Sequence, residues 1–192
     1  MSTASSGRRQ RVPAAVRRGA VVDAAVHEFA QGGLHGTPVD RIARRVGVAQ
    51  PYVFSLFGSK RELFLAAVER GFALVADTFS RAVAEFDPAV WRPPADVLTA
   101  MGSAYVELLS SHRDYLMLQH HAYAACDDEV IRRRVRASYA RLVVHVVQLS
   151  GAEQERIDDF FRYGMWLNVA AAMGVEDLSA GCEWIRAEQP EE

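Results

Sequence analysis

Apolar residues recur at spacings of three and four along most of this 192-residue chain, and this spacing limits its fold more than any other feature. Such spacing places the apolar side chains along one face of a helix. We find no run in which every second residue is apolar, as is typical of half-buried strands, and no internal repeat. The sequence therefore predicts an all-α protein.

The first expected helices are bounded by residues that start or stop helices. A stripe containing Val21, Ala25 and Phe29 predicts a helix over 14–31, ended by the two glycines that follow it. A second, short helix is expected to begin with Thr37 as its cap and Pro38 in its first turn. The Asp40 carboxylate would then reach back to the Thr37 amide.

A third short helix is expected over 50–57, after a break at Gly47. Ser59, with Glu62 three residues later, forms a capping pattern for a long fourth helix over about 60–86. Further helices are expected at about 95–111, 113–126, 128–150 and 153–174, with a short tail helix near 177–187.

A short helix, a glycine turn and a second short helix form the helix-turn-helix arrangement, whose second helix lies in the DNA major groove. Val53 and Phe57 belong on the buried side of residues 50–57. The other side then presents Gln50, Pro51, Tyr52 and Ser55, with Phe54 and Leu56 at the edges. A glutamine can pair with an adenine edge, and rings can lie against thymine methyls. The plain alternative is an ordinary helical corner with well-capped ends.

Residues 37–64, TPVDRIARRVGVAQPYVFSLFGSKRELF, resemble the DNA-binding segment of the TetR family. The shared pattern is T-x-x-x-I-A-x-x-x-G-V, a short aromatic-rich helix and F-G-S-K-x-x-L. The resemblance covers residues 14–70 and is only architectural beyond about residue 90. It implies an N-terminal three-helix helix-turn-helix domain and a C-terminal helical domain for ligand binding and dimerisation. It also implies base contacts for Gln50 and Pro51 and a phosphate contact for Lys60.

The sequence departs from the family at Phe54 and Leu56, where relatives often carry a Tyr or His that donates to phosphate. Asp40 stands where a relative has a base-reading Arg, so that contact is not carried over. Contacts with DNA are expected from Thr37, Arg41, Gln50, Pro51, Tyr52, Phe54, Ser55 and Lys60. The basic residues before and at the start of the first helix are either solvated or touch DNA: Arg8, Arg9, Arg11, Arg17 and Arg18.

Charge is divided unevenly along the chain. Residues 1–70 contain eleven Arg and Lys against five Asp and Glu, whereas residues 71–192 contain eleven against nineteen. A basic head on an acidic body suggests that only the head approaches DNA. This argues against a non-specific architectural DNA-binding protein, which the basic arm alone would favour. The expected organisation is a basic arm (1–12), a helix-turn-helix domain (13–60) and a regulatory and dimerisation domain (61–192).

The predicted helix over 153–174 is apolar on more than one side, so it needs two partners. It is either a central core helix or, as the resemblance implies, a helix between a ligand pocket and a second copy of the chain. The second case gives a homodimer on a palindromic operator. Candidate pocket residues, each of which could equally be core, are Tyr105, Met117, His121, Tyr123, Tyr163 and Trp166.

No cofactor or metal is expected. His120 and His121 are adjacent, so they point apart on a helix, and neither has a ligand at the useful i+4 spacing. The alternative is an all-helical enzyme that uses His120, Cys126 and Asp127 or Asp128. The sequence has neither a nucleophile elbow nor a phosphate loop to support it, so we do not expect an enzyme.

The compartment is indicated by the cysteines and by the length of the apolar runs. The chain has two cysteines, Cys126 and Cys182, and no apolar run reaches about 18 residues. We therefore expect a cytoplasmic protein without membrane contact. The expected function is a DNA-binding repressor released by a small apolar or aromatic effector of unknown identity.

Overall fold

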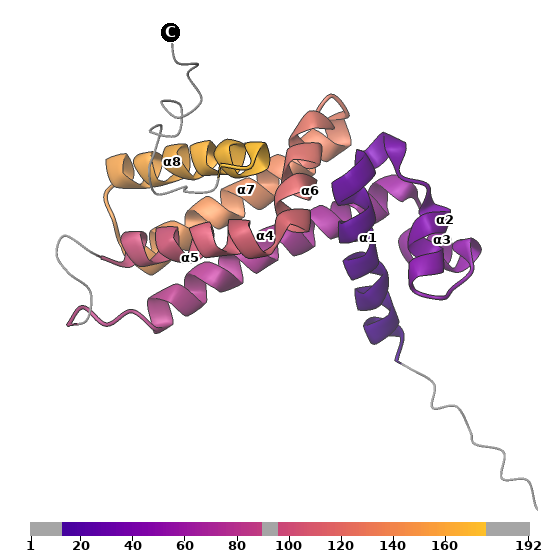
Figure 1. The fold of residues 1–192 in the computed structure, drawn as a ribbon, viewed down its shortest axis with the longest axis horizontal. Coiled ribbons are helices and arrows are strands. Elements are labelled where there is room, and N and C mark those ends of the chain that lie inside the picture. The colour runs from indigo at the N-terminus through magenta and orange to yellow at the C-terminus, as the bar shows by residue number, and fades with distance from the viewer. Residues whose placement is uncertain (1–12, 90–95, 176–192) are drawn as a thin grey trace, which may run out of the picture.

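The computed structural model describes residues 13–89 and 96–175, and within these ranges every regular element is a helix (Figure 1). The helices are α1 (Ala14–Gly36), α2 (Val39–Arg45), α3 (Gln50–Phe57), α4 (Lys60–Ala84), α5 (Val97–Ser111), α6 (Arg113–Ala124), α7 (Glu129–Ser150) and α8 (Gln154–Met173). All eight helices predicted between residues 14 and 174 are present, which confirms the all-α class. The predicted tail helix near 177–187 and the arm residues Arg8, Arg9 and Arg11 lie outside the described residues.

The helical ends follow from local chemistry in most places. Gly33 within α1 has φ 60° and ψ −169°, so the regular helix is interrupted where the sequence predicted its end. A Cβ on Gly33 would also lie 2.8 Å from Nδ1 of His121, so no side chain fits there without movement. Ser59 caps α4 as predicted, because its hydroxyl accepts a hydrogen bond from the Glu62 N–H at 3.1 Å.

The predicted cap of α2 is wrong. Pro38 occupies the position before the helix, and no side chain caps it. The Thr37 hydroxyl donates instead to the backbone oxygen of Glu28 at 3.0 Å, and the Asp40 carboxylate pairs with Arg44 at 2.7 Å. A buried backbone acceptor on α1 therefore captures the hydroxyl that the local pattern assigned to the cap.

Two apolar cores hold the helices together. The first core joins α1, α2, α3 and the start of α4, and includes Phe29, Ile42, Val53 and Phe64. The rings of Phe29 and Phe64 meet edge to face with centroids 5.1 Å apart. The second core lies among α4, α5, α7 and α8 and includes Phe79, Met101, Val146 and Leu167.

Helix α6 belongs to both halves of the molecule. Leu118 and Ala122 on α6 are buried in the first core, and α6 packs directly along α1 (Figure 1). The first core thus includes residues on both sides of the predicted domain boundary at residue 60. Because these helices are closely packed, a displacement of α6 would therefore shift the helices that precede α4.

No helix in the described ranges is both long enough and apolar enough to cross a bilayer.

Candidate DNA interface and ligand cavity

Helix α3 separates into two faces, as the sequence predicted. Val53 and Phe57 are buried in the first core, whereas Gln50, Pro51 and Ser55 are exposed. Phe54 is also exposed, and Tyr52 is half-buried. Ser55 donates to the backbone oxygen of Tyr52 at 2.7 Å, so its hydroxyl oxygen keeps lone pairs for a further partner.

The turn before α3 depends on Gly47, which has φ 69°. This left-handed conformation is open to glycine without strain. The turn is closed by the Val48 N–H, which donates to the Ala43 oxygen at 3.0 Å. The turn therefore fixes the direction in which α3 leaves α2.

Arg18 holds α3 against α1. Its guanidinium lies 4.1 Å from the centre of the Phe57 ring and donates to the Leu56 oxygen at 2.6 Å. Arg18 was predicted either to be solvated or to touch DNA as part of the basic arm. Arg18 is exposed, and it also braces the helix-turn-helix, which is a role the sequence reasoning missed.

Glu28 on α1 is a second brace that the sequence reasoning missed. Its side chain is buried, with a residue exposure of 4%, yet it carries a carboxylate. Arg45 donates to Oε1 at 2.9 Å, and Arg41 lies 2.9 Å from Oε2, so two of the three arginines of α2 pair with it. The available signal was an acidic residue within the apolar stripe of the first helix.

Three of the residues predicted to contact DNA have partners within the chain. Thr37 is 1% exposed and its hydroxyl is used within the head, so we remove it from the candidate interface. Arg41 is half-exposed and shared with Glu28. Lys60, the first residue of α4, donates to the His35 oxygen at 3.2 Å, and partial burial lowers the pKa of its ammonium.

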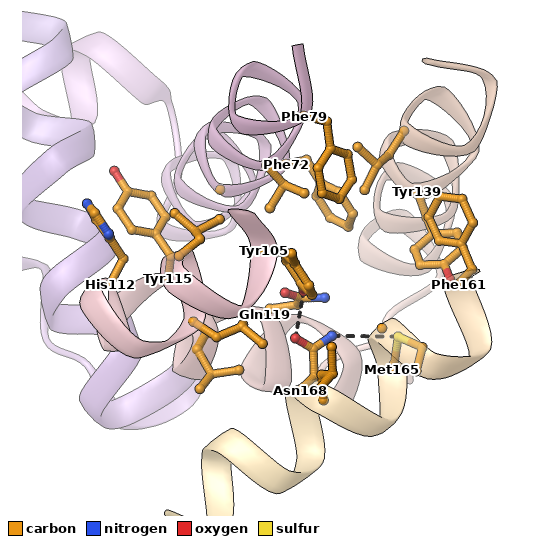
Figure 2. Close-up of a pocket in the computed structure, with 18 of the residues that line it drawn as sticks. Phe72, Phe79, Tyr105, His112, Tyr115, Gln119, Tyr139, Phe161, Met165 and Asn168 are labelled. Carbon is orange, nitrogen blue, oxygen red and sulfur yellow. Dashed lines mark hydrogen bonds between the residues drawn. The ribbon is translucent and has the colours of Figure 1, made fainter. Parts of the chain in front are cut away.

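A cavity of about 90 Å³ lies in the body among α4, α5, α6, α7 and α8 (Figure 2). Its walls are mostly aromatic and aliphatic, including Phe72, Phe79, Tyr115, Tyr139 and Phe161. An engineered protein cavity of roughly 150 Å³ accommodates benzene. A ligand of that size or larger therefore has to move these side chains apart.

Two of the six predicted pocket residues, Tyr105 and Tyr163, line this cavity. The other four do not: Met117, His121, Tyr123 and Trp166. On α6 the residues that line the cavity are Tyr115, Leu116, Leu118 and Gln119, and His112 lines it just before this helix. Met117 and Tyr123 pack against the first core, and His121 lies against Gly33 of α1. Trp166 stacks on Tyr163 with ring centroids 5.6 Å apart and packs against the second core.

A small polar cluster interrupts the apolar lining. The Tyr105 hydroxyl on α5 donates to Oδ1 of Asn168 on α8 at 2.6 Å, and Gln119 on α6 lies beside them (Figure 2). Burial raises the pKa of Tyr105 well above its ordinary value and that of Tyr123 to about 12, so both phenols stay neutral. Asn168 was not among the predicted pocket residues, although a lone amide in an apolar stripe marks it in the sequence.

The outer sides of α7 and α8 carry large apolar side chains in contact with solvent. These are Val144 and Val147 on α7 and Tyr163, Val169 and Met173 on α8. The three on α8 follow one helical stripe with Trp166. Several exposed large apolar side chains on neighbouring helices are typical of protein–protein interfaces.

Comparison with known proteins agrees with the helix-turn-helix assignment. Residues 21–67 match the family model described as bacterial regulatory proteins, tetR family. A stretch of 63 residues is 41% identical to the HTH-type transcriptional activator FasR of Mycolicibacterium smegmatis, covering 33% of this chain and 29% of FasR. The match thus spans less than a third of that relative's length.

Two solved structures extend the likeness over most of the chain. A TetR-like transcriptional regulator from Rhodococcus sp. RHA1 is 26% identical, with a TM-score of 0.60 over 89% of this chain and 88% of that one. The transcriptional regulator FadR from Bacillus subtilis, in complex with stearoyl-CoA, shares the fold at 17% identity, with a TM-score of 0.64 over 84% of this chain and 91% of FadR. Residues 21–67 therefore match the tetR family of bacterial regulatory proteins, and the chain as a whole is similar in fold to TetR-like regulators.

Proposed function

We propose that this protein is a dimeric transcriptional repressor that acts on DNA in the cytoplasm, reads a palindromic operator with α3 and is released by a small apolar or aromatic effector. The observation that carries the proposal is the outer face of α3. Gln50, Pro51 and Ser55 are exposed at a helix whose opposite face is closed by the first core. Such a helix fits the major groove and offers groups that distinguish bases. The proposal includes no catalytic step.

Phosphate contacts are proposed for residues that flank α3. Lys60 and the half-exposed Arg41 can each keep a backbone or carboxylate partner and still present N–H donors, because both groups carry several. Tyr52 and Phe54 would lie against sugars or thymine methyls. These contacts position the head, while Gln50, Pro51 and Ser55 select the sequence.

The dimer is proposed to form through α7 and α8. Their exposed apolar side chains, Val144, Val147, Tyr163, Val169 and Met173, would be buried between two copies related by a twofold axis. Two heads placed this way read half-sites about one helical turn apart, roughly 34–36 Å.

Release is proposed to act through both α4 and α6. Val68 on α4 and Leu118 on α6 belong to the first core and also line the cavity. A ligand that spreads the cavity walls therefore displaces residues on which α1 rests. A tenfold preference of the ligand for the displaced state, about 1.4 kcal/mol, weakens operator binding tenfold.

Selection of bound DNA from a random pool tests the proposal. We expect an enriched palindrome, and Gln50→Ala should lose roughly 1–3 kcal/mol on it and relax one position of the motif. Lys60→Ala is the matched control for backbone contact and should weaken all sequences alike, with a shallower salt dependence. No enrichment, or competition by random DNA as effective as the palindrome, would favour an architectural DNA-binding protein instead.

A reporter gene placed behind the selected operator tests the direction of regulation. Repression by the protein is expected, and relief of repression should follow addition of any compound that occupies the cavity. FasR is described as an activator, so increased transcription is the outcome that would overturn the repressor assignment.

A further inference from the structure

The described walls of the cavity lack the side chains that are fully charged at neutral pH. Of the 23 described residues that line it, none is Asp, Glu, Lys or Arg, and its histidine, His112, is exposed on the residue that joins α5 to α6. A buried carboxylate, phosphate or ammonium needs an opposite charge or several hydrogen bonds to replace its hydration. The described walls offer no such counter-charge.

Asn168 is the most deeply buried polar side chain among the described lining residues, with an exposure of 2%. Its Oδ1 is occupied by the Tyr105 hydroxyl at 2.6 Å. Its Nδ2 carries two N–H donors, and the acceptor it faces is Sδ of Met165 at 3.8 Å (Figure 2). A thioether is a weak acceptor, so the amide has donor capacity that an oxygen in the cavity could use.

The neighbouring amide of this cluster, Gln119, already uses one of its donors. Nε2 of Gln119 donates to the Tyr123 hydroxyl at 2.7 Å, and that hydroxyl lies 3.9 Å from Sδ of Met165. The Asn168 backbone oxygen is 3.2 Å from Nε2 of His120, so α6 also holds this turn of α8. Asn168 is therefore held in place with its amide nitrogen beside the cavity.

We propose that the effector is an electrically neutral molecule with an aromatic or alicyclic body and a single hydrogen-bond-accepting oxygen, which accepts from the Asn168 amide. The inference rests on the proposed ligand-released function and names the chemical class that this cavity takes. The ring walls contact the apolar body, and the Asn168 donor selects a carbonyl over a plain hydrocarbon. A carboxylate or an ammonium of the same shape is rejected because its charge would be buried without a partner.

Four probes of nearly equal size test this class directly: acetophenone, ethylbenzene, benzoate and phenyltrimethylammonium. Binding to the full chain is followed by NMR of protein labelled with methyl-¹³C methionine. The resonance of Met165, assigned with Met165→Leu, reports on the cavity because Met165 lines it. Acetophenone should shift this resonance saturably and bind roughly five-fold tighter than ethylbenzene, the ratio expected for one net hydrogen bond. Benzoate and phenyltrimethylammonium should bind at least ten-fold more weakly than acetophenone.

Asn168→Leu should abolish the preference for acetophenone over ethylbenzene while ethylbenzene still binds. Gln154→Leu is the matched control, because Gln154 is an exposed amide at the start of α8 and its loss should leave the preference unchanged. If Asn168→Leu does not fold, the relative affinities of the four probes for the parent protein still test the proposed ligand class.

Equal binding of acetophenone and ethylbenzene would overturn the role of Asn168. Binding of benzoate or phenyltrimethylammonium as tight as that of acetophenone would overturn the neutral class; the cation also tests whether the aromatic walls act as a cation–π cage. No arm of the experiment contains DNA. A wrong probe order therefore refutes the ligand class alone, whereas a failed operator selection refutes the proposed function.

Discussion

The buried carboxylate of Glu28 is expected to hold α1 and α2 together through its ion pairs. The substitution Glu28→Gln measures how much these ion pairs contribute to the free energy of unfolding. The substitution keeps the shape of the side chain but removes the charge that pairs with Arg41 and Arg45, each at 2.9 Å. Breaking a fully buried ion pair costs about 3–5 kcal/mol, whereas an exposed pair contributes about 0–1 kcal/mol. The Glu28 side chain is 5% exposed but the two arginines are 48% and 44% exposed, so the case lies between these limits. We expect the free energy of unfolding to fall by about 1–3 kcal/mol.

For a chain of this length, each kcal/mol corresponds to roughly 2–4 °C in Tm, so thermal unfolding followed by circular dichroism should show a fall of roughly 2–12 °C. Glu107→Gln is the matched control, because Glu107 is exposed on α5 and its substitution should leave Tm unchanged. The same Glu28→Gln variant, measured below its Tm, should bind non-operator DNA more tightly, because one negative charge beside Arg41 is gone. An unchanged Tm would refute the assignment of Glu28 as a brace, and weaker non-operator binding would refute the electrostatic part of the reasoning.

Two further predictions concern the body and its coupling to the head. Val169→Glu, at a position 48% exposed on α8, should place a charge in the proposed dimer interface and give monomers in sedimentation equilibrium at micromolar concentration. Val16→Glu is its control at an exposed valine on α1, and a dimeric Val169→Glu would refute the choice of interface. Asp128 caps α7 through the N–H groups of Ile131 and Val130, and these bonds together with Arg61 hold the pKa of its carboxyl below the ordinary 3.8. Because the folded-state pKa is the lower one, the stability that Asp128 adds is present above about pH 4 and is lost as pH falls through the folded value. The difference in stability between the parent and Asp128→Ala, measured by urea unfolding, should therefore narrow below pH 4, and a difference that does not change with pH would contradict this.

Local chemistry was sufficient for the helices and for the two faces of α3. The predicted third helix, 50–57, coincides with Gln50–Phe57, because its limits are set by Gly47 and Gly58, which both have positive φ. The capping pattern at Ser59 was also correct, since its partner, the Glu62 N–H, is only three residues away. Interactions confined to one turn of chain can be read from sequence because both partners are close in every conformation.

Predictions that needed a distant partner were less successful. Thr37 was expected to cap α2, but the fold brings it against the Glu28 oxygen, a buried acceptor nine residues earlier. Arg18 was assigned to a basic arm, yet the Leu56 oxygen and the Phe57 ring on α3 hold it. For Thr37 the tertiary neighbour competes with the local one, and the buried contact is favoured because an unpaired buried polar group is costly. For Arg18 both partners lie on a helix that is distant in sequence, so local patterns could not indicate them.

The cavity shows most clearly what tertiary structure alone decided. The sequence predicted that aromatic residues of the body surround a ligand, and Tyr105 and Tyr163 do line the cavity. It could not tell which face of α6 turns inward, because α6 is packed on one side by α1 and on another by the cavity, so both faces are apolar in the sequence. Only packing assigned Gln119 to the cavity and His121 to Gly33. The sequence by itself determined the all-α class and the limits and two faces of α3, through interactions within one or two turns. The positions of Glu28 and Asn168 depended on how the helices pack together.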